Sequence, residues 1–149
     1  MKNNSQLSTV LHALIHMADR GGPMTSEALA ACLHTHPVVV RRLMAGLRQA
    51  GFVVSERGHG GGWVLARDLA SVSLLDVQLA LGKPVVAAEV VPQCLVAQAV
   101  QQALAGTVRE ADALLVKRLA QITLADLAAD FQRRMAGLTP AQRRAAHAA

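Results

Sequence analysis

Residues 55–67 read SERGHGGGWVLAR, with four glycines among the five positions 58–62 and an arginine on either side. Residues 52–56 and 63–66, which flank this loop, each have the composition of a short strand. Two strands joined by a glycine-rich turn are typical of a β-hairpin. Glycine allows such a loop to adopt positive φ angles and to approach another backbone closely. The stretch therefore predicts a hairpin with a flexible, cationic loop.

A phosphate-binding loop is the alternative explanation for so many glycines. A Walker A loop requires a lysine followed by serine or threonine after its last glycine, but here Trp63 follows Gly62. A dinucleotide-binding fingerprint that began at Gly58 would need its third glycine at position 63, which is again Trp63. The sequence therefore favours the hairpin over both phosphate-binding motifs.

The residues before the hairpin predict three helices. Apolar residues recur every three or four positions over about residues 5–20, which indicates a first helix with one buried stripe. Gly21-Gly22-Pro23 is expected to end it, because glycine accepts the left-handed cap and proline cannot continue a helix. Thr25 or Ser26 is the expected N-cap of a second, short helix.

A tight turn at residues 34–36 precedes a third helix, with Pro37 in its favoured first turn and Gly51 after its end. Its predicted buried face consists of Val40, Leu43, Met44 and Leu47. Its opposite face carries Val38, Arg41, Arg42, Ala45, Arg48 and Gln49. Two helices joined by a tight turn form a helix-turn-helix, and a hairpin directly after it makes a winged helix. The alternative is a three-helix bundle whose last helix merely has a solvated charged face, and the hairpin disfavours it.

Composition narrows the class of protein. The 149 residues fit one compact domain, or one small domain with a helical extension. The chain is 52% hydrophobic, and its core must be aliphatic because only Phe52, Trp63 and Phe131 are aromatic. The net charge is +5, of which residues 34–67 supply +4, and this placement favours nucleic acid as the partner. Three aromatic residues are too few for the stacking platforms of a single-strand binder.

Other classes are disfavoured on simple grounds. No run of 18 apolar residues is available for a membrane span, and the N-terminus does not read as a signal peptide. The two cysteines do not form a disulfide framework, so a cytoplasmic location is expected. The chain is not expected to be an enzyme, because it lacks a carboxylate pair, a nucleophile beside a base and a set of metal ligands.

The second half predicts more helices than a winged helix needs. Residues 73–82 are expected to form a capped helix, residues 83–93 an exposed connector or short strand, and residues 96–104 another helix. A capping-box pattern at residues 107–110 predicts the start of a further helix, and Thr123 the start of the last one. So much apolar helix outside a small core favours a two-fold dimer, with packing inside the monomer as the alternative. The expected domains are 1–67 for DNA binding, 68–135 for dimerisation and sensing, and 136–149 as a flexible tail.

The motif AGFVVS at residues 50–55, followed by RGHGGGWVLAR at residues 57–67, resembles the Rrf2 family of bacterial winged-helix transcription regulators. The resemblance spans about residues 5–135 and is most specific in the hairpin. It implies a homodimer on an imperfect palindrome, with the third helices in successive major grooves and the hairpins in flanking minor grooves. By position it also implies the residues that contact DNA, namely Val38, Arg41, Arg42 and Arg57.

General chemistry supports these positions independently. Arginine can bridge O6 and N7 of guanine, and valine can pack against the methyl group of thymine. The negative potential of a narrow A·T minor groove attracts an arginine such as Arg57. Arg48 and His59 are expected to contact phosphates, which position a protein on DNA without reading its sequence.

The cysteines bear on cofactors and sensing. Cluster-binding members of the family group three cysteines in the connector, whereas this chain has only Cys94 there, and Cys32 is expected in the core. No iron–sulfur cluster or other cofactor is therefore expected. Cys32-x-His34-x-His36 has only a superficial likeness to a metal site, because both histidines occupy the turn. Cys94 lies near a helix N-terminus, which favours a thiolate, so it is a candidate redox sensor with a structural role as the alternative.

Together these features predict a mainly α-helical protein with one small hairpin, a winged helix-turn-helix followed by dimerisation helices. The predicted function is a dimeric, sequence-specific, DNA-binding transcription regulator, a repressor that responds to redox state or to a small effector. The alternative is a protein-interaction adaptor that keeps the winged helix without DNA binding. Four arginines on one face, Arg41, Arg42, Arg48 and Arg57, argue against the adaptor.

Overall fold

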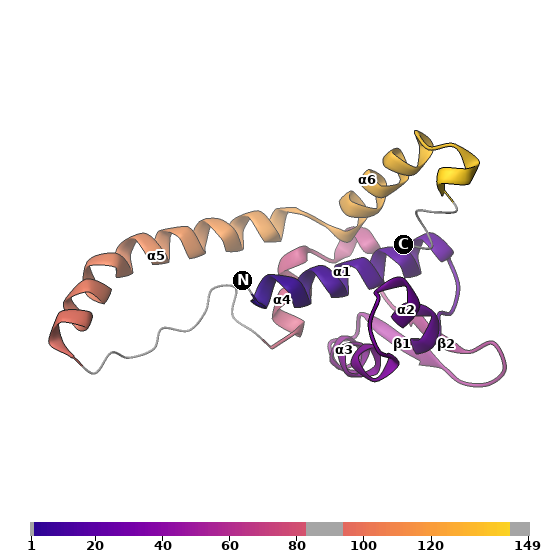
Figure 1. Ribbon diagram of the computed structural model, residues 1–149, viewed down its shortest axis with the longest axis horizontal. Helices are drawn as coiled ribbons and strands as arrows, with labels where there is room; N and C mark the ends of the chain where they lie inside the picture. The colour runs from indigo at the N-terminus through magenta and orange to yellow at the C-terminus, as the bar shows by residue number, and fades with distance from the viewer. Residues whose placement is uncertain (1, 83–93, 144–149) are drawn as a thin grey trace.

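The computed structural model describes residues 2–82 and 94–143, and side chains from residue 6 onward (Figure 1). In chain order the elements are α1 (Lys2–Arg20), α2 (Ser26–Cys32), α3 (Pro37–Gln49), β1 (Val53–Glu56), β2 (Gly62–Leu65), the 3-10 turn η1 (Leu69–Ser71), α4 (Leu74–Ala80), α5 (Leu95–Gln121) and α6 (Leu124–Ala136). The prediction of a mainly helical chain with a two-stranded hairpin is confirmed. The expected connector at residues 83–93 lies outside the described residues.

Helix α1 is the centre of the core. Its side chains Val10, Ala13 and Leu14 are fully buried, and the helix packs against α2, α4, α6 and β2. It ends as predicted at Gly21, whose φ of 65° is left-handed and whose N–H donates to the carbonyl of Met17 at 3.1 Å. The core is aliphatic except for Phe52 and the partly buried Trp63.

The helix-turn-helix forms where local signals predicted it. The Thr25 hydroxyl caps α2 by accepting the N–H of Ala28 at 3.1 Å. The His36 ring caps α3 by accepting the N–H of Val38 at 3.3 Å, directly before Pro37 at the start of that helix. The buried residues of α3 are the four predicted ones, Val40, Leu43, Met44 and Leu47.

The hairpin is fastened to the start of α2. Strands β1 and β2 pair antiparallel, and Trp63 extends the pairing by exchanging two backbone hydrogen bonds with Met24, at 2.8 and 3.0 Å. The Trp63 indole also donates to the Ser26 hydroxyl at 3.0 Å. A Cβ on Gly62 would lie 2.6 Å from the Met24 carbonyl oxygen, so only glycine fits at this crossing. The base of the hairpin is therefore held, while its loop extends beyond it (Figure 1).

Helices α4 and α6 start side by side. Leu74 N–H donates to the Ile122 carbonyl and Leu124 N–H to the Val72 carbonyl, both at 2.9 Å. Each helix begins with a capping box, built on Ser73 and Asp76 in α4 and on Thr123 and Asp126 in α6. Leu124 is buried in the main core, so the last helix is part of the same folded unit as the winged helix.

The predicted helix start at residues 107–110 is wrong, because α5 runs without interruption from Leu95 to Gln121. The pattern of Thr107 followed three residues later by Glu110 also fits one turn inside a helix. Gly106 costs such a helix only about 1 kcal/mol relative to alanine, which is less than the loss of several backbone hydrogen bonds at a break. The surrounding glutamine, alanine and leucine residues favour continuation.

Helix α5 extends beyond the rest of the described chain at the left of Figure 1. It has no buried residue, although Leu95, Val96, Val100 and Leu104 are apolar and exposed. None of the described helices is both long and apolar enough to cross a bilayer. After α6, residues 140–143 begin another helical turn, with the Thr139 hydroxyl accepting the N–H of Gln142 at 3.4 Å.

Candidate nucleic-acid interface

The outward face of α3 carries the predicted contact residues. Val38, Arg41, Arg42 and Arg48 are all exposed, on the side of the helix opposite its buried residues. Val38 keeps 48% of its surface accessible, which is unusual for an apolar side chain on a helix with a well-formed buried face. The face therefore combines three cations with one apolar contact, the residue types that read bases and hold phosphates in a major groove.

Arg41 is held by an acid on the preceding helix. Its guanidinium donates to the Glu27 carboxylate at 2.7 Å, and 57% of the Arg41 side chain and 61% of the Glu27 side chain remain exposed. A hydrogen bond from its own backbone N–H, and then the Arg41 guanidinium, lower the pKa of Glu27. Arginine has five N–H donors, so this pair orients Arg41 and leaves donors for a second partner.

The hairpin loop presents the other two predicted residues. Arg57 and His59 are exposed, and Gly58 and Gly60 between and beside them have φ angles of 103° and 82°. The Gly61 N–H closes the turn by donating to the Gly58 carbonyl at 3.1 Å. Strand β1 packs against α3, and in Figure 1 α3 lies to the left of the hairpin while the loop extends from its other end, to the right.

Sequence reasoning did not identify two of the residues that shape this surface. Arg67 donates to the Gly51 carbonyl at 3.1 Å and the Ala50 carbonyl at 3.3 Å, and its guanidinium lies 4.9 Å from the centre of the Phe52 ring. It thereby caps the C-terminal end of α3 and ties it to the hairpin. Glu27 was missed because its partner Arg41 is 14 residues away, a separation that no helical periodicity links.

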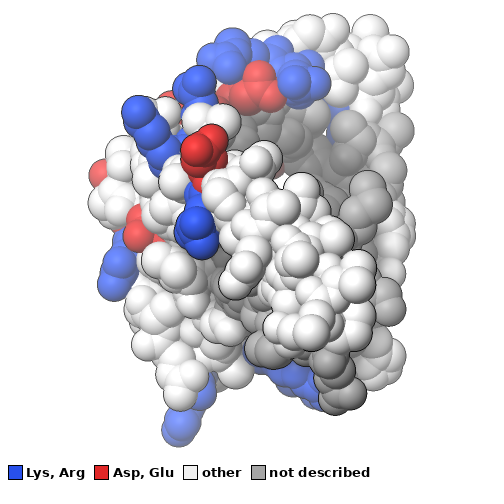
Figure 2. All heavy atoms as spheres, turned by 90° about the vertical axis from the view of Figure 1, so that its left-hand side faces the viewer, with Lys and Arg blue, Asp and Glu red and all other residues white. Residues whose placement is uncertain are grey.

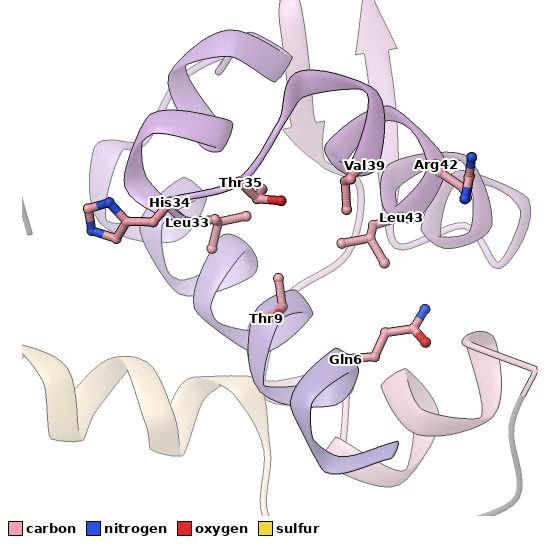
Figure 3. Close-up of a pocket in the computed structure, with 8 residues that line it drawn as sticks. All are labelled: Gln6, Thr9, Leu33, His34, Thr35, Val39, Arg42 and Leu43. Carbon is pink, nitrogen blue, oxygen red and sulfur yellow. The ribbon is translucent and has the colours of Figure 1, made fainter. Parts of the chain in front are cut away.

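A hollow of about 450 Å³ adjoins this face, between the first turns of α1, the α2–α3 turn and α3. In Figure 3 Thr9, Leu33, Val39 and Leu43 point toward one another across it, while His34 and Arg42 lie at its two ends. The lining residues are Gln6, Thr9, Leu33, His34, Thr35, Val39, Arg42 and Leu43. Its hydroxyl, amide and guanidinium groups are hydrogen-bond donors of the kind that bind a phosphate.

The candidate sensor Cys94 lies at the helix start where it was predicted. It is the N-cap of α5, is exposed, and its Sγ accepts the N–H of Ala97 at 3.3 Å. Cys32, by contrast, is partly buried on α2 and packs against the core, as predicted. Figure 2 views the molecule from the side at which α5 starts, and uncharged residues make up most of that face.

Comparison with known proteins gives consistent matches. The family model "Rrf2: Iron-dependent Transcriptional regulator" matches residues 3–130. YwnA of Bacillus subtilis (strain 168), assigned as an HTH-type transcriptional regulator, is 33% identical over 130 residues, covering 83% of this chain and 95% of that protein. The structure of CymR (YrzC), the global cysteine regulator of B. subtilis, is 27% identical with a TM-score of 0.64, covering 87% of this chain and 94% of CymR. A transcriptional regulator assigned in Lactobacillus plantarum reaches a TM-score of 0.68 at 26% identity, covering 85% of this chain and 89% of that one.

Iron appears in the family description, but the described metal-binding side chains of this chain do not form an iron–sulfur site. The whole chain contains two cysteines, which is too few for a cluster held by three cysteines of one subunit. In Figure 1 the start of α5, where Cys94 lies, is far from helix α2, which carries Cys32. Within residues 2–82 and 94–143 there is no group of three or more His, Cys, Asp or Glu side chains that could hold a metal ion. The donors of one chain do not fit such a cluster.

Proposed function

The chain belongs to the Rrf2 family of transcriptional regulators, and we propose that it is a homodimeric repressor that binds an imperfect DNA palindrome. The observation that carries the proposal is the exposed cationic side of α3, followed in the chain by a hairpin loop on which Arg57 is also exposed. Its relatives are described as regulators of transcription and not as enzymes. A repressor of this kind acts by occupying a promoter and so excluding the transcription machinery.

In the proposed complex, α3 enters the major groove. Val38 and Arg41 face base edges, Arg42 lies beside them, and Arg48 contacts a phosphate. The ion pair with Glu27 limits the directions in which Arg41 can point, which reduces the conformational entropy lost when it meets a base. The recognition of sequence therefore comes from a few pre-oriented side chains.

The hairpin loop provides the second contact. Arg57 is proposed to enter the minor groove that flanks the major-groove contact, and His59 to reach a phosphate. The fastening of Trp63 to Met24 and Ser26 supports this role, because it fixes the base of the loop relative to α2. Glycines at positive φ let the loop follow the groove.

Dimerisation is proposed to occur through α5. Helix α5 has no fully buried side chain, yet Val96 is 74% exposed, and Val100 and Leu104, which follow it on the same face of the helix, are more than half exposed. A row of apolar residues on a long helix requires a partner surface, and a second copy across a two-fold axis is the economical one. Two copies would place two α3 helices on one palindrome.

Regulation by an oxidant or a small effector is part of the same proposal, with Cys94 as the reacting group for an oxidant. Its exposed Sγ lies at the start of the proposed dimerisation helix, so oxidation there would alter the helix cap. A comparison of Cys94→Ser with the parent under peroxide tests this, and equal DNA affinities in both would exclude Cys94 as the sensor.

The experiment for DNA binding is a selection from random duplexes, followed by titration of the selected duplex at several salt concentrations. Specific binding is expected to weaken steeply with salt. Arg57→Ala is expected to weaken binding by about 1–3 kcal/mol if Arg57 makes a base contact. Arg133→Ala, which removes the same charge from α6, is the control and should have little effect. Salt-insensitive or absent binding would favour the adaptor instead.

A further inference from the structure

Two histidines of α1 face each other at their ring nitrogens. His12 and His16 are four residues apart, which places them on one face of the helix, and their Nε2 atoms are 2.9 Å apart. The ring centroids are separated by 4.7 Å and the ring planes are tilted by 39°. The DNA-binding proposal uses neither residue.

In the metal-free chain this contact is a hydrogen bond between the two rings, and an ion bound to both nitrogens would replace the shared proton at a similar spacing. Imidazole nitrogens bind transition metals at roughly 2.0–2.1 Å, so two of them at right angles around one ion lie about 2.9 Å apart. A tetrahedral ion would hold them about 3.3 Å apart. Right-angled sites with nitrogen and oxygen ligands are typical of copper(II) and nickel(II), whereas zinc prefers the tetrahedron.

We propose that His12 and His16 together chelate one nickel(II) or copper(II) ion. In the part of the chain that the structure describes, no third His, Cys, Asp or Glu joins them in a group that could hold a metal, so water completes the coordination. Two histidines at this spacing on one helix also hold the metal in known zinc motifs, which shows that the helix itself sets a usable geometry.

Each histidine of the pair borders a different hollow on the surface of α1. His12 lines a hollow of about 300 Å³ between α1 and α6, together with Asp130, Phe131 and Arg134. Asp130 is paired with Arg133 and Arg134, so these three side chains carry a net charge of +1 and the binding of an ion must come from the two imidazoles. The His16 ring lies 6.5 Å from the Phe131 ring, and His16 lines a second hollow with Asp19, Arg20 and Cys32.

An ion at this place would stabilise the folded chain. The unfolded chain does not hold the two nitrogens together, so binding energy becomes folding energy. The pair lies on α1 beside its contact with α6, which joins the winged helix to the C-terminal helices. The inference does not depend on DNA binding, and either proposal can fail without the other.

The test is a calorimetric titration of the tag-free chain with nickel chloride. The cysteines are reduced beforehand, and the buffer contains no chelator and no thiol. One tight site per chain is expected. His12→Ala and His16→Ala should each weaken it about 100-fold or more, because a chelate loses its advantage when either arm is removed. His59→Ala and Cys94→Ser are the controls, and both should retain the tight site.

Two outcomes would overturn the proposal. One is that each single variant removes only part of the bound nickel while the rest keeps its affinity, which indicates independent histidines. The other is that His59→Ala or Cys94→Ser weakens binding as much as the α1 variants do. As a second measurement, nickel should raise the Tm of the parent and not that of the two α1 variants, with circular dichroism confirming that these remain helical.

Discussion

At the scale of single residues, the proposed DNA-binding residues include four arginines, and one of them is paired with an acid. Arg42, Arg48 and Arg57 are exposed, whereas Arg41 forms an ion pair with Glu27. An acid on a DNA-facing surface repels phosphates and weakens binding to any sequence. Its presence is explained if it orients Arg41 for a base and so improves discrimination between sequences.

Replacing Glu27 with glutamine tests this role. We expect Glu27→Gln to raise affinity for random duplex, because one repulsive charge is gone, while affinity for the selected palindrome gains less or falls. The ratio of the two affinities should drop about fivefold or more, since a bidentate arginine contact discriminates by about 1–3 kcal/mol. Both affinities are measured by fluorescence anisotropy at one salt concentration.

Glu110→Gln is the matched control, because Glu110 is exposed on α5 and away from α3. It removes the same charge and should raise both affinities slightly and equally. An unchanged ratio in Glu27→Gln would mean that the ion pair with Arg41 is a passive surface contact, which is the usual finding for exposed pairs.

At the scale of elements, the hairpin depends on a close crossing of two backbones. We expect Gly62→Ala to destabilise the protein by about 1–3 kcal/mol, because the new methyl group would lie 2.6 Å from the Met24 carbonyl oxygen. Gly22→Ala is the control, since nothing lies within 4 Å of the Cβ it would add, and it should be neutral or slightly stabilising. Urea unfolding measures both, and equal effects would show that the crossing is not tight.

The capping boxes of α4 and α6 give a pH dependence. Hydrogen bonds from the side chain and backbone of Ser73 lower the pKa of Asp76, and those from the backbone and side chain of Thr123 lower the pKa of Asp126. A lowered folded-state pKa contributes stability that is fully present above the ordinary carboxyl pKa of about 4 and is lost as the pH falls through the folded value.

The double variant Asp76→Asn with Asp126→Asn should therefore be less stable than the parent at pH 6, and this difference should shrink to near zero well below pH 4. Urea unfolding between pH 3 and pH 7 measures it. A difference that stayed constant over that range would show that the carboxylate charge is not what the caps use.

Local sequence signals were sufficient to predict the elements of the winged helix, but contacts between residues far apart in the sequence could not be predicted. Gly21, Thr25, Pro37 and Gly51 each mark an element boundary through their own backbone or side-chain chemistry, so these boundaries could be read from the sequence. The exposed side of α3 followed from its periodicity. Arg67 could not be placed this way, because its partners Ala50 and Gly51 lie across the hairpin and meet it only in the folded chain.

The unbroken helix α5 shows a second limit of prediction from local sequence patterns. The Thr107 pattern is a valid signal only where a helix starts, and the sequence does not say whether one is already in progress. The same pattern was right at Thr123, where the bridge between Ser73 and Thr123 stops the preceding helix. Tertiary pairing decided between the two positions.

At the scale of the whole molecule, the winged helix buries its apolar residues within one chain, whereas α5 leaves apolar residues exposed. The core formed by α1 to α4 and the start of α6 buries its apolar residues, but α5 leaves Val100 at 55% and Leu104 at 56% exposed. A dimer across α5 would cover these residues and set the spacing of the two α3 helices. DNA affinity should then depend on residues that never touch DNA.

The double variant Val100→Glu with Leu104→Glu tests this dependence. We expect a monomer by light scattering, with an unchanged circular dichroism spectrum because both side chains lie outside the core. Affinity for the selected palindrome should fall about 100-fold or more, since each half-site is then bound alone, while binding to random duplex changes little.

Gln102→Glu adds charge to the opposite side of α5 and should leave the dimer and its DNA affinity intact. A dimer that survived the double variant would place the interface elsewhere, and a monomer with full affinity would show that one subunit reads the site alone.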